Sequence, residues 1–323
     1  MKDNKKTSDY LTIKESRAII KYNVKQMKYY EAQKRRKLAP AEYTAEMDDE
    51  NNVVEIDDLH TSFFTDRGTV KSVNGVSFAI PKNKIVGVVG ESGCGKSVTS
   101  LSIMQLVQAP QGQVTGGQIR FNVEELGYSE NGKKYGYDIA KMPTEAMHKI
   151  RGKDITMIFQ EPMTSLNPVF TIGYQLDEVS FLHKPELNKE QVKEYSIEML
   201  KKVGISMPER FYSAYPHELS GGMRQRVMIA MALAGNPKLI IADEPTTALD
   251  VTIQAQILEL LKDLQRSQGC SIMLITHDLG VIAEMADEVV VMYAGKVIER
   301  GSAKEIFKNP LHPYTIGLQK SKP

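Results

Sequence analysis

Residues 90–97 form a short glycine-rich run, GESGCGKS, that fits the pattern G-x-x-x-x-G-K-[ST]. In such a run the glycines let backbone N–H groups close around phosphate oxygens, and the helix that follows adds the positive end of its dipole. The amine of Lys96 can reach the β and γ phosphates of a nucleotide, and the hydroxyl of Ser97 can ligate Mg²⁺. The predicted phosphate cradle consists of Gly90, Glu91, Ser92, Gly93, Cys94, Gly95, Lys96, Ser97 and Val98.

Two adjacent carboxylates end a second apolar run, LIIADE, at Asp243 and Glu244. Asp243 is placed to hold Mg²⁺ through water, and Glu244 to orient or deprotonate a water that attacks a phosphate. A helix cap or a surface pair is the alternative, which the apolar run and the turn-forming Pro245 disfavour. The pair therefore predicts hydrolysis of the bound nucleotide.

A second glycine-rich helix start lies in the run LSGGMRQ, at Ser220, Gly221 and Gly222. Serine is a good N-cap, and the free N–H groups behind it form another anion site. The chain thus has two phosphate-binding helix starts but one set of magnesium ligands. We expect the second start to serve the nucleotide of another subunit.

The elements around these residues alternate between strand and helix patterns. The run KIVGVVG before the phosphate cradle is apolar enough to be a central parallel strand, and helical spacing follows it over 98–108. Helices are also predicted over 188–203 and 221–234, and a polar loop or hairpin over 127–136.

After Pro237 the chain reads as strand, helix, strand and then a hairpin that turns at Ala294 and Gly295. The helix carries apolar residues on one face at Ile253, Ile257, Leu260, Leu261 and Leu264. Strand, helix and strand in this order predict an α/β protein with a mostly parallel sheet. No internal repeat is present, so we expect one such unit per chain.

The composition excludes several classes of protein. The 323 residues carry a net charge of +1, no apolar run long enough to span a bilayer, and two cysteines, too few for a disulfide framework.

Residues 1–40 nevertheless hold 12 Lys and Arg against 4 Asp and Glu. The helical spacing of Ile20, Val24 and Met27 in this stretch predicts a basic amphipathic helix that binds anionic lipid or docks on a partner. A solvated extension is the alternative. The acidic MDDENN is expected to be a linker.

Taken in order, these motifs resemble those of the ATP-binding cassette ATPases, whose signature LSGGQ is matched except that Met223 replaces Gln. The resemblance implies a P-loop NTPase (RecA-like) core with an antiparallel β subdomain and an inserted α-helical subdomain. The implied divisions are a basic extension and linker at 1–52, the first part of the core with the β subdomain at 53–160, the helical signature subdomain at 161–235, the second part of the core at 236–300 and a tail at 301–323.

The resemblance also implies roles for further residues, with ATP and Mg²⁺ as ligands. Gln160 matches the glutamine that contacts Mg²⁺ and the attacking water, and His277 matches the histidine that contacts the γ-phosphate. Asp250 matches an aspartate that crosses the dimer interface, although it is also placed as an N-cap. Phe63 is expected to stack on adenine, with Phe64 as the competing candidate.

Two stretches, FQEPMTSLNPVFTIG and NPLHPYTIGL, are similar to those of oligopeptide and dipeptide permease ATPases, a group that includes nickel importers. This implies a peripheral subunit on the cytoplasmic face of a bacterial membrane. Its implied partners are a second, probably non-identical ATPase, two transmembrane permease subunits and an extracytoplasmic solute-binding protein. A membrane-subunit helix is expected to dock near Glu161 to Pro168. A nucleic-acid-associated cassette ATPase is the less favoured alternative, so no nucleic acid is expected as a partner.

Overall fold

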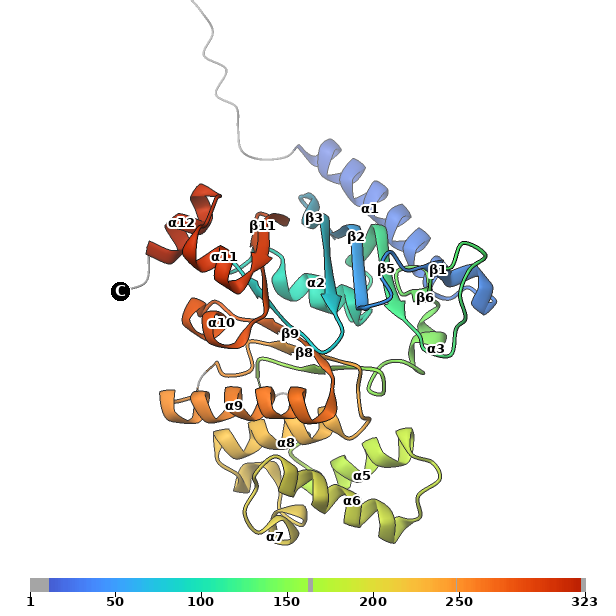
Figure 1. Cartoon of the computed structure of the whole chain (residues 1–323). Helices are drawn as coiled ribbons and strands as arrows, with labels where there is room; N and C mark the ends of the chain where they lie inside the picture. Colours follow the sequence, from blue (N-terminus) through green and yellow to red (C-terminus); the bar gives the residue numbers. More distant parts are fainter. Residues whose placement is uncertain (1–11, 162–164, 248, 321–323) are drawn as a thin grey trace, which may run out of the picture.

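A computed structural model describes residues 12–161, 165–247 and 249–320. Its centre is a six-stranded sheet in the order β11-β10-β4-β9-β8-β7, parallel except for the pair β10 and β11 (Figure 1). The strands are β4 Ile85–Val89, β7 Ile155–Ile158, β8 Leu239–Asp243, β9 Ser271–Ile275, β10 Glu288–Tyr293 and β11 Lys296–Ser302. The predicted α/β class, parallel sheet and hairpin are confirmed.

The parallel sheet is buried on both faces, as its apolar strands require. Every residue of β4, β8 and β9 is buried. Alternate residues point to opposite faces, so Ile240 and Ala242 of β8 join one hydrophobic cluster while Leu239 and Ile241 join another. The first cluster packs against the helices, and the second against the antiparallel sheet.

That second sheet has the strand order β1-β6-β5-β2-β3 and is antiparallel throughout. Its strands are β1 Thr44–Glu46, β2 Asn52–Thr65, β3 Gly68–Pro81, β5 Gly112–Asn122 and β6 Tyr135–Asp138. The polar segment 127–136 turns back on itself, with a bridge between Tyr128 and Lys134, as the loop or hairpin prediction required.

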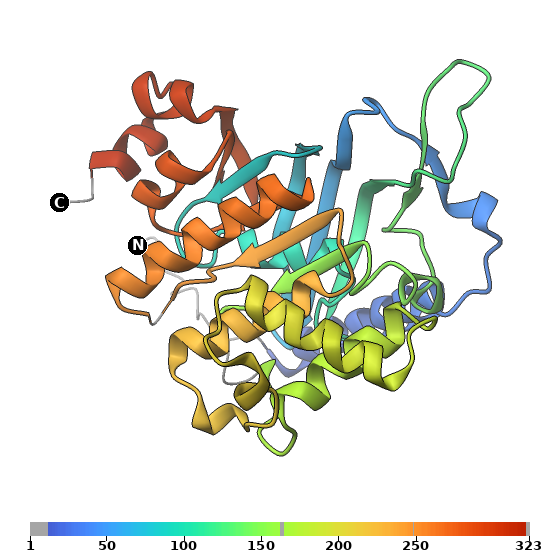
Figure 2. The ribbon, with the colours of Figure 1, turned by 60° about the horizontal axis from the view of Figure 1, so that its bottom comes forward.

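Helices complete the structure, and four of them form a separate layer below the sheets in Figure 1 and in front in Figure 2. These are α5 Ile172–His183, α6 Lys189–Lys202, α7 Pro208–Tyr212 and α8 Gly221–Leu233. Among the described residues, the remaining helices are α1 Ile13–Lys34, α2 Lys96–Ile103, α3 Thr144–Met147, α9 Val251–Gln268, α10 Leu279–Met285, α11 Ala303–Lys308 and α12 Pro313–Lys320, with short 3-10 turns η1 Pro40–Tyr43 and η2 Pro216–Glu218. In the described ranges no helix is both long and apolar enough to cross a membrane.

One expectation about local structure is wrong. The helix predicted over 98–108 ends at Ile103, because Gln105 adopts a positive φ of 50° and donates from its amide to the carbonyls of Ile139 and Met142. The segment MDDENN, predicted to be a linker, is held by contacts with the antiparallel sheet. Asp48 forms an ion pair with Arg120, and the backbone N–H groups of Asp48 and Asp49 donate to Glu55. The early end of α2 comes from contacts with residues distant in the sequence.

The basic N-terminal segment forms α1, which packs against the antiparallel sheet of its own chain. Asn23 is buried and donates from Nδ2 to the carbonyl of Thr65 at 2.6 Å. The ring of Tyr30 stacks on Phe64 with centroids 6.2 Å apart. The helix predicted there is confirmed, and one of its faces is covered by this sheet.

Candidate nucleotide-binding and hydrolysis site

The glycine-rich run forms the loop between β4 and α2, and its glycines are required by close backbone approach. Gly95 has φ 106°, and a Cβ added there would lie 2.5 Å from the carbonyl oxygen of Ser72. Gly90 has φ 151°, and its Cβ would overlap the carbonyl oxygen of Met292. Larger residues at these two positions would push the loop off β3 and β10, so the backbone cradle depends on glycine.

Lys96 is the first residue of α2 and is nearly buried, at 5% exposure. Its Nζ donates to the carbonyls of Gly90 at 2.8 Å and Glu91 at 3.0 Å. The ammonium group is therefore held within the loop, between backbone acceptors that a phosphate oxygen can replace. A cation in this position suits the charge of a nucleotide phosphate.

Ser97, in the first turn of α2, and Asp243, at the end of β8, bring two oxygen ligands together. Ser97 Oγ donates to Asp243 Oδ1 at 3.0 Å. Burial raises the pKa of Asp243, and the hydrogen bond from Ser97 opposes that shift. A hydroxyl beside a buried carboxylate fits Mg²⁺, a hard cation that takes oxygen ligands and favours the ionised acid.

Glu244 is the centre of the candidate catalytic group. Its Oε2 atom accepts from Gln160 Nε2 at 3.3 Å and from Thr247 Oγ1 at 2.9 Å, and His277 Nδ1 lies 3.4 Å away. The backbone of Glu244 has φ 47° and donates its N–H to the carbonyl of Ile275. A non-glycine residue with this φ is strained, and such strain is typical of functional sites.

This arrangement brings together three of the sequence-predicted residues, since Glu244, Gln160 and His277 meet at one carboxylate oxygen. The side chain of Glu244 is 19% exposed and that of His277 is 66% exposed. The carboxylate can therefore accept a proton from a water at the protein surface. The amide of Gln160 contacts Glu244, whereas its expected role as a magnesium ligand stays a prediction.

The second glycine-rich run lies at the start of α8, beside the start of α9. Ser220 is the N-cap of α8 and accepts from the N–H of Met223, and Asp250 is the N-cap of α9 and accepts from the N–H of Ile253. A Cβ added to Gly222 would lie 2.7 Å from the Ile253 side chain. Two predicted interface motifs thus lie side by side, and both N-caps are exposed.

The two candidate adenine-stacking rings differ in their surroundings. Phe64 is 6% exposed and stacks on Tyr30, so its ring is already covered. Phe63 is half-buried, and a Cβ on Gly112 would lie 2.7 Å from its Cε1 atom. Of the two rings, Phe63 has surface left for a ligand. Its stacking role stays a prediction.

Sequence reasoning missed two residues of the site, Thr247 and Tyr314. The Tyr314 hydroxyl, in α12, accepts from the backbone N–H of Glu91 in the phosphate loop at 3.0 Å. Its ring lies 4.7 Å from that of Tyr293, and burial raises the pKa of the Tyr314 hydroxyl, so it stays neutral. The sequence signal for Tyr314 is the stretch NPLHPYTIGL, which contains it.

Replacing Glu244 with Gln removes the proton acceptor while keeping the shape of the side chain. We expect single-turnover hydrolysis of ATP to slow by about 10²–10⁴-fold, while ATP binding stays within a few-fold. Single-turnover kinetics with labelled ATP, beside equilibrium binding, measures both. Equal hydrolysis rates for the two proteins would contradict the role of Glu244.

Replacing Tyr314 with Phe keeps the ring and removes the acceptor for Glu91 N–H. Loss of one hydrogen bond to the phosphate loop, worth about 0.5–1.5 kcal/mol, should raise KM for ATP by roughly two- to tenfold and change kcat less. Tyr293→Phe is the matched control, since it alters the neighbouring ring and leaves the bond to Glu91 in place. Equal KM values for the two variants would show that the hydroxyl of Tyr314 has no role in nucleotide binding.

Comparisons with known proteins identify the family of the chain. Residues 73–247 match the ABC transporter family. The chain is 53% identical to the oligopeptide transport ATP-binding protein OppD of Bacillus subtilis, over 84% of this chain and 72% of that one. It is 51% identical to the dipeptide transport ATP-binding protein DppD of the same organism, over 84% of this chain and 78% of that one.

A solved structure of the ATP-binding cassette MJ0796, in a dimeric post-hydrolysis state bound to ADP and Pi, matches with a TM-score of 0.64 and 27% identity. The match covers 77% of this chain and 98% of that one. The chain has a phosphate loop and a pair of carboxylates at a strand end, and its relatives are ATP-binding transport proteins. It therefore belongs to the ABC transporter family and is an ATPase of that family.

Proposed function

We propose that this chain is the ATP-hydrolysing motor subunit of a bacterial peptide importer. The observation that carries the proposal is the meeting of Gln160, Thr247 and His277 at one oxygen of Glu244, next to the carboxylate that pairs with Ser97. Relatives at 50–53% identity are named as peptide transport proteins, which favours peptides over nickel as the cargo.

Each residue of the site has a separate role in ATP hydrolysis. Glu244 accepts the proton of a water whose oxygen attacks the γ-phosphorus, and ADP leaves. Lys96 stabilises the negative charge that develops on the phosphate oxygens, and His277 contacts the γ-phosphate. Ser97 and Asp243 would hold Mg²⁺, which neutralises further phosphate charge when bound.

The second nucleotide-binding surface is proposed to act on another subunit. Ser220 and Asp250 are the N-caps of two neighbouring helices, and both residues are exposed. We infer that this surface closes over ATP held by a second ATPase subunit, of a kind similar to this one but not identical. Binding of ATP between the two subunits then drives their closure.

A groove between β7, α5 and α8 offers a place for a permease subunit. It has a volume of about 630 Å³ and is lined by apolar side chains, among them Leu106, Phe159, Phe170 and Leu182. Phe159 precedes Gln160 in the chain, so movement in the groove reaches the hydrolysis site directly. A short amphipathic helix of a membrane subunit fits such a surface. Of the stretch from Glu161 to Pro168, positions 162–164 lie outside the described residues, while Ser165, Leu166 and Asn167 line the groove.

These surfaces together define the proposed assembly. The chain is placed on the cytoplasmic face of the membrane as a peripheral subunit, beneath two permease subunits and beside a second ATPase. An extracytoplasmic binding protein would deliver the peptide, which never contacts this chain. Identification of the cargo therefore depends on those subunits.

Replacing Phe170 with Glu tests the groove. A charge among apolar side chains should prevent docking of the permease, so we expect peptide uptake by cells to fall at least tenfold while the purified chain keeps its basal ATPase activity. Phe181→Glu is the matched control, because Phe181 is similarly exposed, at 44% against 41%, and is not part of the groove. Equal uptake with both variants would contradict docking at this groove.

A further inference from the structure

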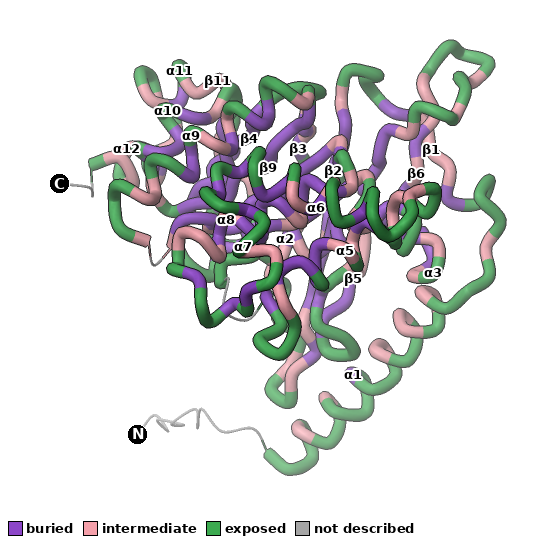
Figure 3. The backbone as a smooth tube through the Cα atoms, turned by 90° about the horizontal axis from the view of Figure 1, so that it is seen from below, coloured by how far each residue is buried: buried purple, intermediate pink, exposed green. Residues whose placement is uncertain are grey.

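The helix α1 is fixed in its rotation by the contacts on one face. Asn23 hydrogen bonds to Thr65, Tyr30 stacks on Phe64, and Glu31 accepts from Gln113 Nε2 at 2.7 Å. These contacts occupy the side of the helix that faces the antiparallel sheet. The residues on the opposite side are consequently held toward solvent, and Figure 3 shows α1 exposed along the edge of the molecule.

That solvent side carries a stripe of positive charge. At 100° per residue, five basic residues fall within a sector of about 80° opposite the sheet. All five are exposed, and none forms an ion pair with the residues that the structure describes. They are Lys14, Arg17, Lys21, Lys25 and Lys28. The acidic residues of α1, Glu15 and Glu31, lie outside this sector, so its charge is not neutralised within the helix.

Exposed apolar side chains lie directly beside the basic stripe. Ile13, Ile20 and Val24 are 74%, 47% and 39% exposed. Aliphatic side chains next to lysines on one helix surface are typical of helices that lie at the surface of an anionic membrane. A solvated face or a purely electrostatic partner surface has no need of these three apolar residues.

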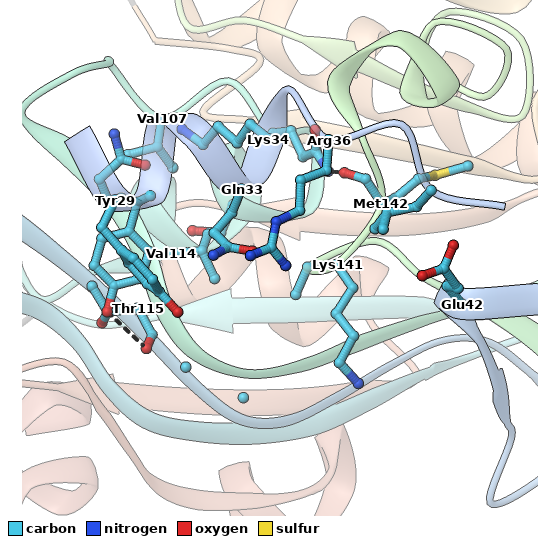
Figure 4. A pocket seen from close by; sticks show the side chains of 18 residues that line it. Tyr29, Gln33, Lys34, Arg36, Glu42, Val107, Val114, Thr115, Lys141 and Met142 are labelled. Atoms are coloured by element: carbon cyan, nitrogen blue, oxygen red, sulfur yellow. Dashed lines mark hydrogen bonds between the residues drawn. The ribbon is translucent and has the colours of Figure 1, made fainter. Parts of the chain in front are cut away.

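The position of α1 relative to the permease groove favours the same partner. Met104 and Leu106 line that groove, while the alternate residues Gln105 and Val107 line a second cavity of about 550 Å³. The opposite wall of this cavity comes from α1 and the residues after it, including Tyr29, Gln33 and Arg36 (Figure 4). One short segment therefore separates α1 from the surface where the permease is proposed to dock.

We propose that the stripe of Lys14, Arg17, Lys21, Lys25 and Lys28 binds the anionic headgroups of the membrane beside the permease. Phosphate groups of the lipids pair with the five cations, and Ile20 and Val24 contact the acyl boundary. The orientation of this helix face toward the bilayer rests on the proposed function. The affinity of the same face for anionic lipid is a property of the isolated chain. The contact would hold the ATPase at the membrane while its nucleotide site opens and closes.

Sedimentation of the full chain with vesicles measures this affinity. We expect binding to vesicles of phosphatidylglycerol and phosphatidylcholine, weakening as salt is raised, and little binding to phosphatidylcholine alone. Each cation near the membrane surface contributes about a fivefold effect, so the triple variant Lys21→Glu, Lys25→Glu and Lys28→Glu should bind at least 100-fold more weakly. Retained basal ATPase activity shows that the variant is folded.

A charge-matched control replaces three exposed lysines on other helices of the same chain. This control should bind the anionic vesicles as the unmodified chain does, apart from a small effect of net charge. It combines Lys189→Glu, Lys304→Glu and Lys308→Glu.

Three results would overturn the proposal: equal vesicle binding by the triple variant and the unmodified chain, equal binding to neutral and anionic vesicles, or salt-sensitive binding to DNA or RNA without binding to vesicles. A chain that binds anionic lipid but supports no peptide uptake would instead count against the proposed function. The two failures are thereby distinguished.

Discussion

The structure depends on one constraint: the carboxyl ends of β4, β8 and β9 must meet at a single edge of the parallel sheet. The phosphate loop leaves β4, Asp243 and Glu244 end β8, and His277 follows β9. Parallel hydrogen bonding between these strands sets the positions of all three loops. Because the strands are buried on both faces, their register is fixed, and the Ser97 hydroxyl and the Asp243 carboxylate come within hydrogen-bond distance.

The surrounding layers connect this edge to the apolar groove and to the C-terminal helix. Gln160 follows β7 and contacts Glu244, while its neighbour Phe159 lies in the apolar groove. On another side Tyr314 joins the C-terminal α12 to the phosphate loop. Short chains of contacts thus run from the hydrolysis site to the groove and to the tail.

Much of the core could be predicted from the sequence, because its signals are local. Apolar runs such as LIIAD mark buried strands, and the glycine spacing of residues 90–97 marks the loop. The errors arise where distant contacts decide the structure. Gln105 ends α2 early by bonding to Ile139 and Met142, and Tyr314 meets Glu91 across 223 positions of the chain. A local pattern can mark Tyr314 or Gln105, but it does not specify the distant partner of either residue.

The central claim is that this ATPase drives a membrane permease, and purification from native membranes tests it most directly. The chain is captured by an affinity tag in mild detergent, and stoichiometric partners are identified by mass spectrometry. The account predicts two multi-spanning proteins and a second ATPase, with a peptide-binding protein recovered alongside them. Recovery of the chain alone, or with nucleic-acid-binding proteins, would contradict it.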